Sequence, residues 1–133
     1  MAKIVGLDHV GIAVKSISES RKTYEGLLGL NFAGEETVET EGVRVAFFEL
    51  GGTRIELIEP LKPDTGVAKF IEKRGEGIHH ICARVEGLAA MLKDLKAKGA
   101  GLTNDVPRPG AHGKKTAFVL PKTTSGVLVE LAE

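Results

Sequence analysis

The 133-residue sequence has no tryptophan, one tyrosine, one cysteine and no excess of either charge, with 18 basic and 18 acidic residues. Balanced charge argues against the basic surface that nucleic-acid-binding proteins present. The single cysteine, Cys82, cannot form an internal disulfide, and its aliphatic neighbours favour a small buried residue over a nucleophile. No apolar run approaches the roughly 20 residues that cross a bilayer. We therefore expect a protein that binds neither nucleic acid nor membrane.

The first ten residues, MAKIVGLDHV, lack both the apolar core of a signal peptide and a basic leader. Together with the absence of a disulfide, this favours a reducing compartment, and we expect a cytoplasmic location. Balanced charge leaves a small molecule or another protein as the expected partner.

The sequence does contain an internal repeat. LDHVGIAV (7–14) is repeated as GIHHICARV (77–85), and TRIELIE (53–59) resembles GVLVELAE (126–133). In the first half 56 − 9 = 47 positions separate the glutamate from the histidine, and in the second half 130 − 80 = 50 positions do. Two histidine–glutamate pairs thus recur in nearly one frame, and a repeat of this length predicts a duplicated architecture.

Hydrophobic periodicity predicts the same order of elements in both halves. The first half is expected to contain a strand at 4–14, a helix between Ser16 and Gly29, and strands at 30–39, 43–50 and 53–59. The second half repeats this order with a strand at 78–85, a helix from Leu88 to before Gly99, and strands at 101–105, 116–120 and 127–132. The segment between the halves predicts a short helix that ends near Gly75.

These elements predict an α+β fold of two tandem βαβββ modules that form a curved, mixed sheet around a metal site. We expect one domain over residues 1–133, with module one at about 1–60, a linker helix at about 61–75 and module two at about 76–133.

The recurring pairs are candidate metal ligands. Because side chains alternate along a strand, His9 and His80 can face the same side of the sheet as Glu56 and Glu130. Two imidazoles and two carboxylates suit a divalent transition metal. A carboxylate buried among aliphatic residues needs a compensating partner, and a metal would supply it. The alternative places both glutamates on the solvent face of half-buried strands.

Three other polar residues have weaker signals. His79 precedes the candidate ligand His80, so it is expected to face the other way and to serve a structural role. His112 lies in a glycine-rich loop, where solvation is expected more than substrate contact. Lys122 belongs to a basic group that could attract the phosphates of an anionic substrate or form ordinary surface; the group also includes Arg108, Lys114 and Lys115.

Taken together, these motifs resemble the vicinal oxygen chelate superfamily over essentially the whole chain. More narrowly, they resemble the methylmalonyl-CoA epimerases. The similar segments are LDHVGIAV, IELIEPLKPDTGVAKFIEKRGEGIHHICARV, GKKTAFVLPK and SGVLVELAE. The middle run and the tail are the specific parts, whereas the double-histidine pattern with its final glutamate is shared with glyoxalase I.

The resemblance implies one divalent metal ion, Co, Mn, Ni or Zn, held by His9, Glu56, His80 and Glu130. It also implies epimerisation of an acyl-CoA substrate, methylmalonyl-CoA, through an enolate, with Glu130 acting both as a ligand and as an acid/base. A homodimer is implied as well.

One position departs from the family pattern. Some members carry a second glutamate three residues after the glycine that matches Gly42, where this chain has Val45. Either another group, such as Glu49, Glu56 or a metal-bound water, serves the second face of the substrate, or the substrate differs. The alternative functions are a glyoxalase I-like lyase and a non-enzymatic small-molecule binding protein of the same superfamily. An extradiol dioxygenase is disfavoured, since it uses two histidines and one carboxylate at iron.

Overall fold

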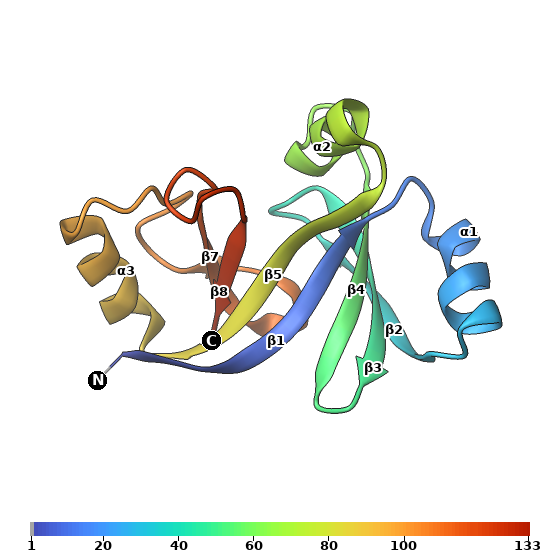
Figure 1. Ribbon diagram of the computed structural model, residues 1–133, viewed down its shortest axis with the longest axis horizontal. Coiled ribbons are helices and arrows are strands. Elements are labelled where there is room, and N and C mark those ends of the chain that lie inside the picture. The colour runs from blue at the N-terminus through green and yellow to red at the C-terminus, as the bar shows by residue number, and fades with distance from the viewer. Residues whose placement is uncertain (1) are drawn as a thin grey trace. The chain divides into compact units, whose positions relative to one another are not determined.

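A computed structural model describes residues 2–133 (Figure 1). The chain divides into two compact units. The first unit is His9–His79, and the second unit combines residues 2–8 with 80–133. The expectation of a single domain stays a prediction.

The first unit contains a four-stranded sheet in the order β2-β3-β4-β1. Strand β4 runs parallel to β1, whereas β2, β3 and β4 pair antiparallel. The elements are β1 (Lys3–Ala13, which enters this unit at His9), α1 (Ile17–Arg21), the π-helix η1 (Lys22–Leu27), β2 (Asn31–Val38), β3 (Val43–Leu50), β4 (Thr53–Pro60) and α2 (Gly66–Arg74).

The helical segment after β1 begins where the sequence predicted. The Ser16 hydroxyl caps α1 by accepting a hydrogen bond from the Glu19 N–H at 3.2 Å. The segment then continues as a π-helix, which the sequence did not predict, and ends before Gly29, whose φ of 74° suits glycine. It covers one face of the sheet through an apolar cluster of Val14, Ile17, Ala46, Phe48 and Leu57.

The second unit repeats the plan with strands in the order β5-β8-β7-β6, of which β5 and β8 are parallel. Its elements are β5 (Gly77–Glu86, which enters this unit at His80), α3 (Leu88–Ala97), β6 (Arg108–Pro109), the short 3-10 helix η2 (Ala111–Gly113), β7 (Lys115–Val119) and β8 (Val129–Ala132). Helix α3 packs on one face of this sheet, in a cluster of Val85, Leu88, Leu92, Ala117, Val119 and Leu131.

The start of α3 is capped from the far end of the chain. Gly87, at the N-cap position, provides no side-chain cap, and the two carboxylate oxygens of Glu133 instead accept hydrogen bonds from the N–H groups of Gly87 and Leu88, both at 2.8 Å. These bonds hold the pKa of Glu133 below its ordinary value. The Glu133 side chain, just after β8, thus accepts hydrogen bonds from backbone N–H groups at the start of α3, which have no partner within the helix.

One predicted strand is wrong. Residues 101–105 form an isolated bridge, Leu102 to Val119, and the edge strand is β6 instead, where Arg108 and Pro109 pair with Thr116 and Lys115. Proline lacks an N–H and is tolerated at a sheet edge, so Pro109 is compatible with a very short edge strand. The order βαβββ is unchanged.

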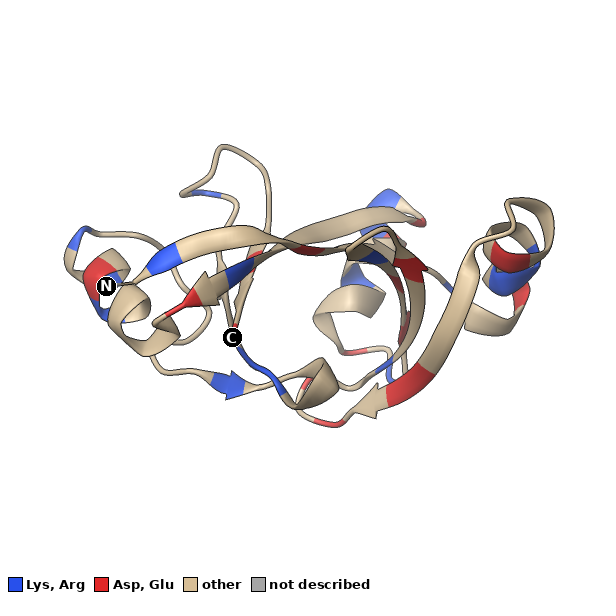
Figure 2. Ribbon diagram, turned by 90° about the horizontal axis from the view of Figure 1, so that it is seen from below, with Lys and Arg blue, Asp and Glu red and all other residues tan. Residues whose placement is uncertain are grey.

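The prediction of an α+β fold with two βαβββ modules is confirmed. Among the described residues, no helix is both long and apolar enough to span a bilayer. Basic and acidic residues are interspersed in each unit (Figure 2).

Candidate metal centre

In the first unit, strand register brings His9 together with Glu56. Gly11 of β1 lies opposite Glu56 of β4, so His9, two residues before Gly11, shares a face with the carboxylate. The His9 Nδ1 lies 3.1 Å from Glu56 Oε2, and the two side chains are only 7% and 4% exposed. This face is opposite to the one that the helical segment covers.

The second unit builds the same pair by the same register. Cys82 of β5 lies opposite Glu130 of β8, and His80 precedes Cys82 by two residues. The His80 Nε2 lies 3.0 Å from Glu130 Oε1, and these side chains are 5% and 12% exposed. Each unit therefore holds one buried imidazole against one carboxylate. These are ligand types that divalent Co, Mn, Ni and Zn accept.

Each glutamate also faces a phenylalanine that the sequence interpretation missed. Phe47 of β3 lies opposite Glu56, and Phe118 of β7 lies opposite Glu130. The Phe118 ring packs edge-on against His80, with 5.4 Å between ring centroids. The signal was available, since the dipeptide Ala-Phe recurs with an offset of 118 − 47 = 71, the same as the histidine offset of 80 − 9 = 71.

A second missed residue is Arg54, which lies opposite His9 in the β1–β4 register. Its Nε and Nη2 both lie 3.2 Å from Glu56 Oε2, and its side chain is 18% exposed. The burial of Glu56 is therefore compensated in part by a guanidinium within the chain. The sequence interpretation named a metal as the compensating partner and missed this guanidinium.

The other histidines and the cysteine lie where alternation places them. His79 packs edge-on against Phe70 of α2, with 4.9 Å between ring centroids, and its structural role stays a prediction. His112 lies in an exposed loop. Cys82 is fully buried, as expected of a small packing residue.

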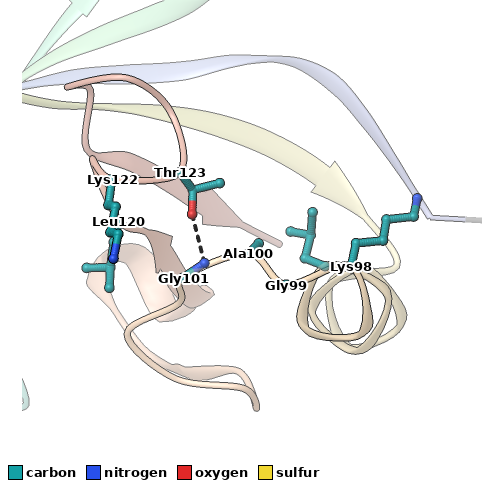
Figure 3. A pocket seen from close by; sticks show the side chains of 8 residues that line it. Lys98, Gly99, Ala100, Gly101, Leu120, Lys122 and Thr123 are labelled. Atoms are coloured by element: carbon teal, nitrogen blue, oxygen red, sulfur yellow. Dashed lines mark hydrogen bonds between the residues drawn. The ribbon is translucent and has the colours of Figure 1, made fainter.

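Lys122 lies at a surface hollow beside the end of α3 rather than in the sheet (Figure 3). Lys98 lines the same hollow, which has a volume of about 610 Å³; Leu95, Gly99, Ala100, Gly101, Leu120 and Thr123 complete it. The Gly101 N–H donates to the Thr123 hydroxyl at 2.8 Å, which ties the turn that carries Lys122 to the segment after α3. The hollow thus combines apolar residues with two lysines, of which Lys98 forms a salt bridge with Asp94, with 2.9 Å between Nζ and Oδ2.

Val45, at the position where some relatives have a glutamate, is buried on the same face as Glu56. Glu36 of β2 lies directly opposite Val45 of β3, so the two side chains share this face. The Glu36 side chain is half-buried. Glu49 also shares this face but is exposed at the end of β3. Glu35, the residue before Glu36, faces the side of the sheet that the helical segment covers, where its carboxylate lies 3.5 Å from the Arg21 guanidinium.

Comparisons with known proteins agree with this architecture. The Glyoxalase/Bleomycin resistance protein/Dioxygenase superfamily matches residues 8–118. The uncharacterised protein YqjC of Bacillus subtilis (strain 168) is 50% identical over 127 residues, which cover 96% of this chain and 91% of that protein. The mitochondrial methylmalonyl-CoA epimerase of Homo sapiens is 38% identical over 128 residues, which cover 96% of this chain and 73% of that protein. A solved methylmalonyl-CoA epimerase in complex with methylmalonyl-CoA and NH4+ has a TM-score of 0.93 and 32% identity, covering 98% of this chain and 94% of that chain.

Proposed function

The chain belongs to the glyoxalase/bleomycin resistance protein/dioxygenase superfamily, and on this premise we propose that it interconverts (R)- and (S)-methylmalonyl-CoA. The observation that carries the proposal is the similarity to methylmalonyl-CoA epimerases over nearly the whole of this chain, at 38% identity over 128 residues for the human mitochondrial enzyme. The buried histidine–glutamate pair in each unit gives that similarity a chemical basis.

We propose that His9, Glu56, His80 and Glu130 hold one divalent metal ion. Support comes from the chemistry of the donors, because each unit buries one imidazole nitrogen against one carboxylate oxygen, and from the repetition of one strand register. When bound, the ion would polarise the thioester carbonyl and lower the cost of removing the α-proton by several kcal/mol.

Inversion at the α-carbon needs proton-transfer groups on its two faces. Glu130 is the proposed acid/base on one face, since it lies on the same side of β8 as the Phe118 ring and its carboxylate contacts His80. Glu130 would take the proton from one epimer while the group on the opposite face gives a proton to the α-carbon to form the other epimer. The two groups exchange roles in the reverse direction, so the partner has to be a group of similar acidity.

We propose Glu36 for the second face. It is a carboxyl group on the face of the first unit that carries Glu56, and it lies directly across the strand pair from Val45. Glu36 is therefore one strand away, about 4.8 Å, from position 45, which carries a glutamate in some relatives. Its half-buried side chain is better protected from bulk water than that of the exposed Glu49.

Lys122 is proposed to attract the phosphates of the acyl-CoA, because it places a positive charge at a partly apolar hollow, whereas Lys98 at the same hollow is paired with Asp94. The homodimer and the cytoplasmic location stay predictions.

The central experiment follows the entry of solvent deuterium at the α-position of methylmalonyl-CoA, with and without added Co(II), and tests methylglyoxal plus a thiol in parallel. Metal-dependent exchange into methylmalonyl-CoA is the expected result. Turnover of the hemithioacetal alone would favour the glyoxalase I-like lyase, and tight binding without turnover would favour a binding protein. Metal content of His80→Ala and Glu56→Ala, measured by mass spectrometry, should fall well below one ion per chain.

The proposed role of Glu36 has its own test. Glu36→Gln is expected to slow epimerisation by about 10²–10⁴-fold, while exchange of the α-proton of one epimer, served by Glu130, persists. The matched control is Glu35→Gln, which changes the neighbouring carboxylate on the opposite face and should leave the rate unchanged. A full rate in Glu36→Gln would assign the second face to another group.

A further inference from the structure

Each unit carries a further glutamate three positions after its candidate metal-binding glutamate. Glu59 follows Glu56 in β4, and Glu133 follows Glu130 just after β8. The two occupy one place in the repeat, because their offset, 133 − 59 = 74, equals that of the candidate ligands, 130 − 56 = 74. Three positions along an extended chain reverse the side on which a side chain lies, so both carboxylates face the helices rather than the ligand face.

Both carboxylates accept hydrogen bonds from the start of a helix. Glu59 Oε1 accepts from the Ile17 N–H, at the start of α1, at 2.7 Å. Glu133 accepts from the N–H groups of Gly87 and Leu88, at the start of α3, both at 2.8 Å. In each unit this helix follows the strand that carries the candidate histidine, β1 or β5. The strand with the ligand carboxylate is thus tied to the stretch of chain with the ligand imidazole.

Resting on the metal ligands proposed above, we infer that Glu59 and Glu133 are positioning residues, each of which holds a strand pair in register and so sets the spacing of the histidine–glutamate pair in its own unit. The strands run parallel in both pairs, β1 with β4 and β5 with β8. Sliding of one strand along the other would therefore change the gap between imidazole and carboxylate, which is 3.1 Å in the first unit and 3.0 Å in the second. Each tie lies three residues, about 10 Å, along the strand from the ligand carboxylate, at the end of the pair where sliding is resisted least.

The competing interpretation is that the two glutamates only cap their helices. The first unit offers a matched control, because α1 has a second cap, the Ser16 hydroxyl, which accepts from the Glu19 N–H at 3.2 Å. This bond stays within the helical segment, whereas the bond to Glu59 reaches β4. Ser16→Ala therefore removes a cap and keeps the tie, and Glu59→Ala removes a cap together with the tie.

The test is titration of Co(II) into each folded variant, followed by the visible absorption of the bound ion, which reports the geometry of its ligands. Glu59→Ala and Glu133→Ala are each expected to weaken Co(II) binding by about 10-fold, the lower end of the range for groups that support metal ligands, and to change the spectrum. Ser16→Ala should keep the wild-type affinity and spectrum.

Conservative variants sharpen the comparison, because a glutamine amide has one acceptor oxygen. That oxygen can keep the bond from the Ile17 N–H, so Glu59→Gln should bind Co(II) nearly as the wild type does. It can serve only one of the two N–H groups that Glu133 serves, so Glu133→Gln should fall between the wild type and Glu133→Ala.

A second measurement needs no metal. The Val14 N–H donates to the Ile58 carbonyl at 2.9 Å, which makes it a reporter of the β1–β4 pairing next to the tie. With a chelator present, Glu59→Ala should speed hydrogen exchange at Val14 several-fold relative to the amides of β3, and Ser16→Ala should not.

Equal Co(II) affinity and equal exchange at Val14 in Glu59→Ala and Ser16→Ala would make the glutamates helix caps only and overturn the inference. If the alanine variants do not fold, Glu133→Gln decides, since a wild-type affinity and spectrum there would overturn it as well. Failure of the proposed metal site is distinguishable, because the wild type would then bind no Co(II), while exchange at Val14 would still decide whether Glu59 holds the register.

Discussion

Removal of the Glu56 carboxylate should destabilise the metal-free protein more than the loss of one hydrogen bond explains. Glu56→Leu keeps a side chain suited to β4 but leaves the Arg54 guanidinium, 18% exposed, without the carboxylate oxygen 3.2 Å away. Breaking a buried ion pair by removing one partner costs about 3–5 kcal/mol. The partial exposure of Arg54 gives it some access to water, so we expect a loss of about 3 kcal/mol, near the lower end of this range.

The double variant Glu56→Leu/Arg54→Met separates this effect from a general loss of packing. Replacement of both charges by apolar groups is often close to neutral, so the double variant should lose less than the Glu56→Leu variant alone. Unfolding by urea in the presence of a chelator, followed by circular dichroism, measures the four corners of the cycle. A loss below about 1 kcal/mol for Glu56→Leu, or additive losses in the double variant, would refute the argument.

The same variants report on the metal. A ligand that binds only the folded state at 100 times its Kd adds about 2.7 kcal/mol to the free energy of unfolding. Added Co(II) should therefore stabilise the wild type and leave Glu56→Leu unchanged. Equal stabilisation of both proteins would remove Glu56 from the ligand set.

Three further predictions concern the framework. Hydrogen bonds to the carboxylates of Glu133 and Asp105 lower the pKa of each group in the folded state. Their contribution to the free energy of unfolding should therefore be complete above pH about 4.5 and be lost as the pH falls through the lowered pKa values. In thermal unfolding, Glu133→Gln should flatten this pH dependence. Gly42→Ala should lose about 1–2 kcal/mol in urea unfolding, because φ is 66° and a new Cβ would lie 2.9 Å from Thr65 Cγ2. Leu92→Ala, which truncates a fully buried side chain of α3, should lose about 2–5 kcal/mol in the same assay, and retained stability would contradict the assigned core.

Periodicity predicted most of the elements because the sheets are amphipathic. Strand β3 begins and ends at the predicted residues, and the helix after Leu88 ends before Gly99 as expected. The error at 101–105 arose because the second half was expected to repeat the order of the first, whereas strand pairing is decided by a partner far along the chain. The very short β6 has no periodicity that a sequence window could detect.

The histidine–glutamate pairs were predictable because both members repeat, but their surroundings were not. Arg54 has no counterpart at the matching place in the second half, where Leu128 precedes Glu130 by two residues, so a search for repeated residues passes over it. Glu36 is likewise a single residue, and its relation to Val45 depends on the β2–β3 register. The pairing next to the β2–β3 turn, where Val38 lies opposite Val43, sets this register, and the bulge between Phe32 and Gly34 shifts only the residues before it.

The identical placement of each phenylalanine opposite its glutamate has a consequence for how the chain tolerates insertions. From Phe47 to Glu56 there are 56 − 47 = 9 positions, but from Phe118 to Glu130 there are 130 − 118 = 12. Three additional residues therefore lie between β7 and β8 without shifting the opposed pair. The turn at Gly51 and Gly52 should accept lengthening by the same number, and loop length becomes a variable that evolution or an engineer can change independently of the chemistry.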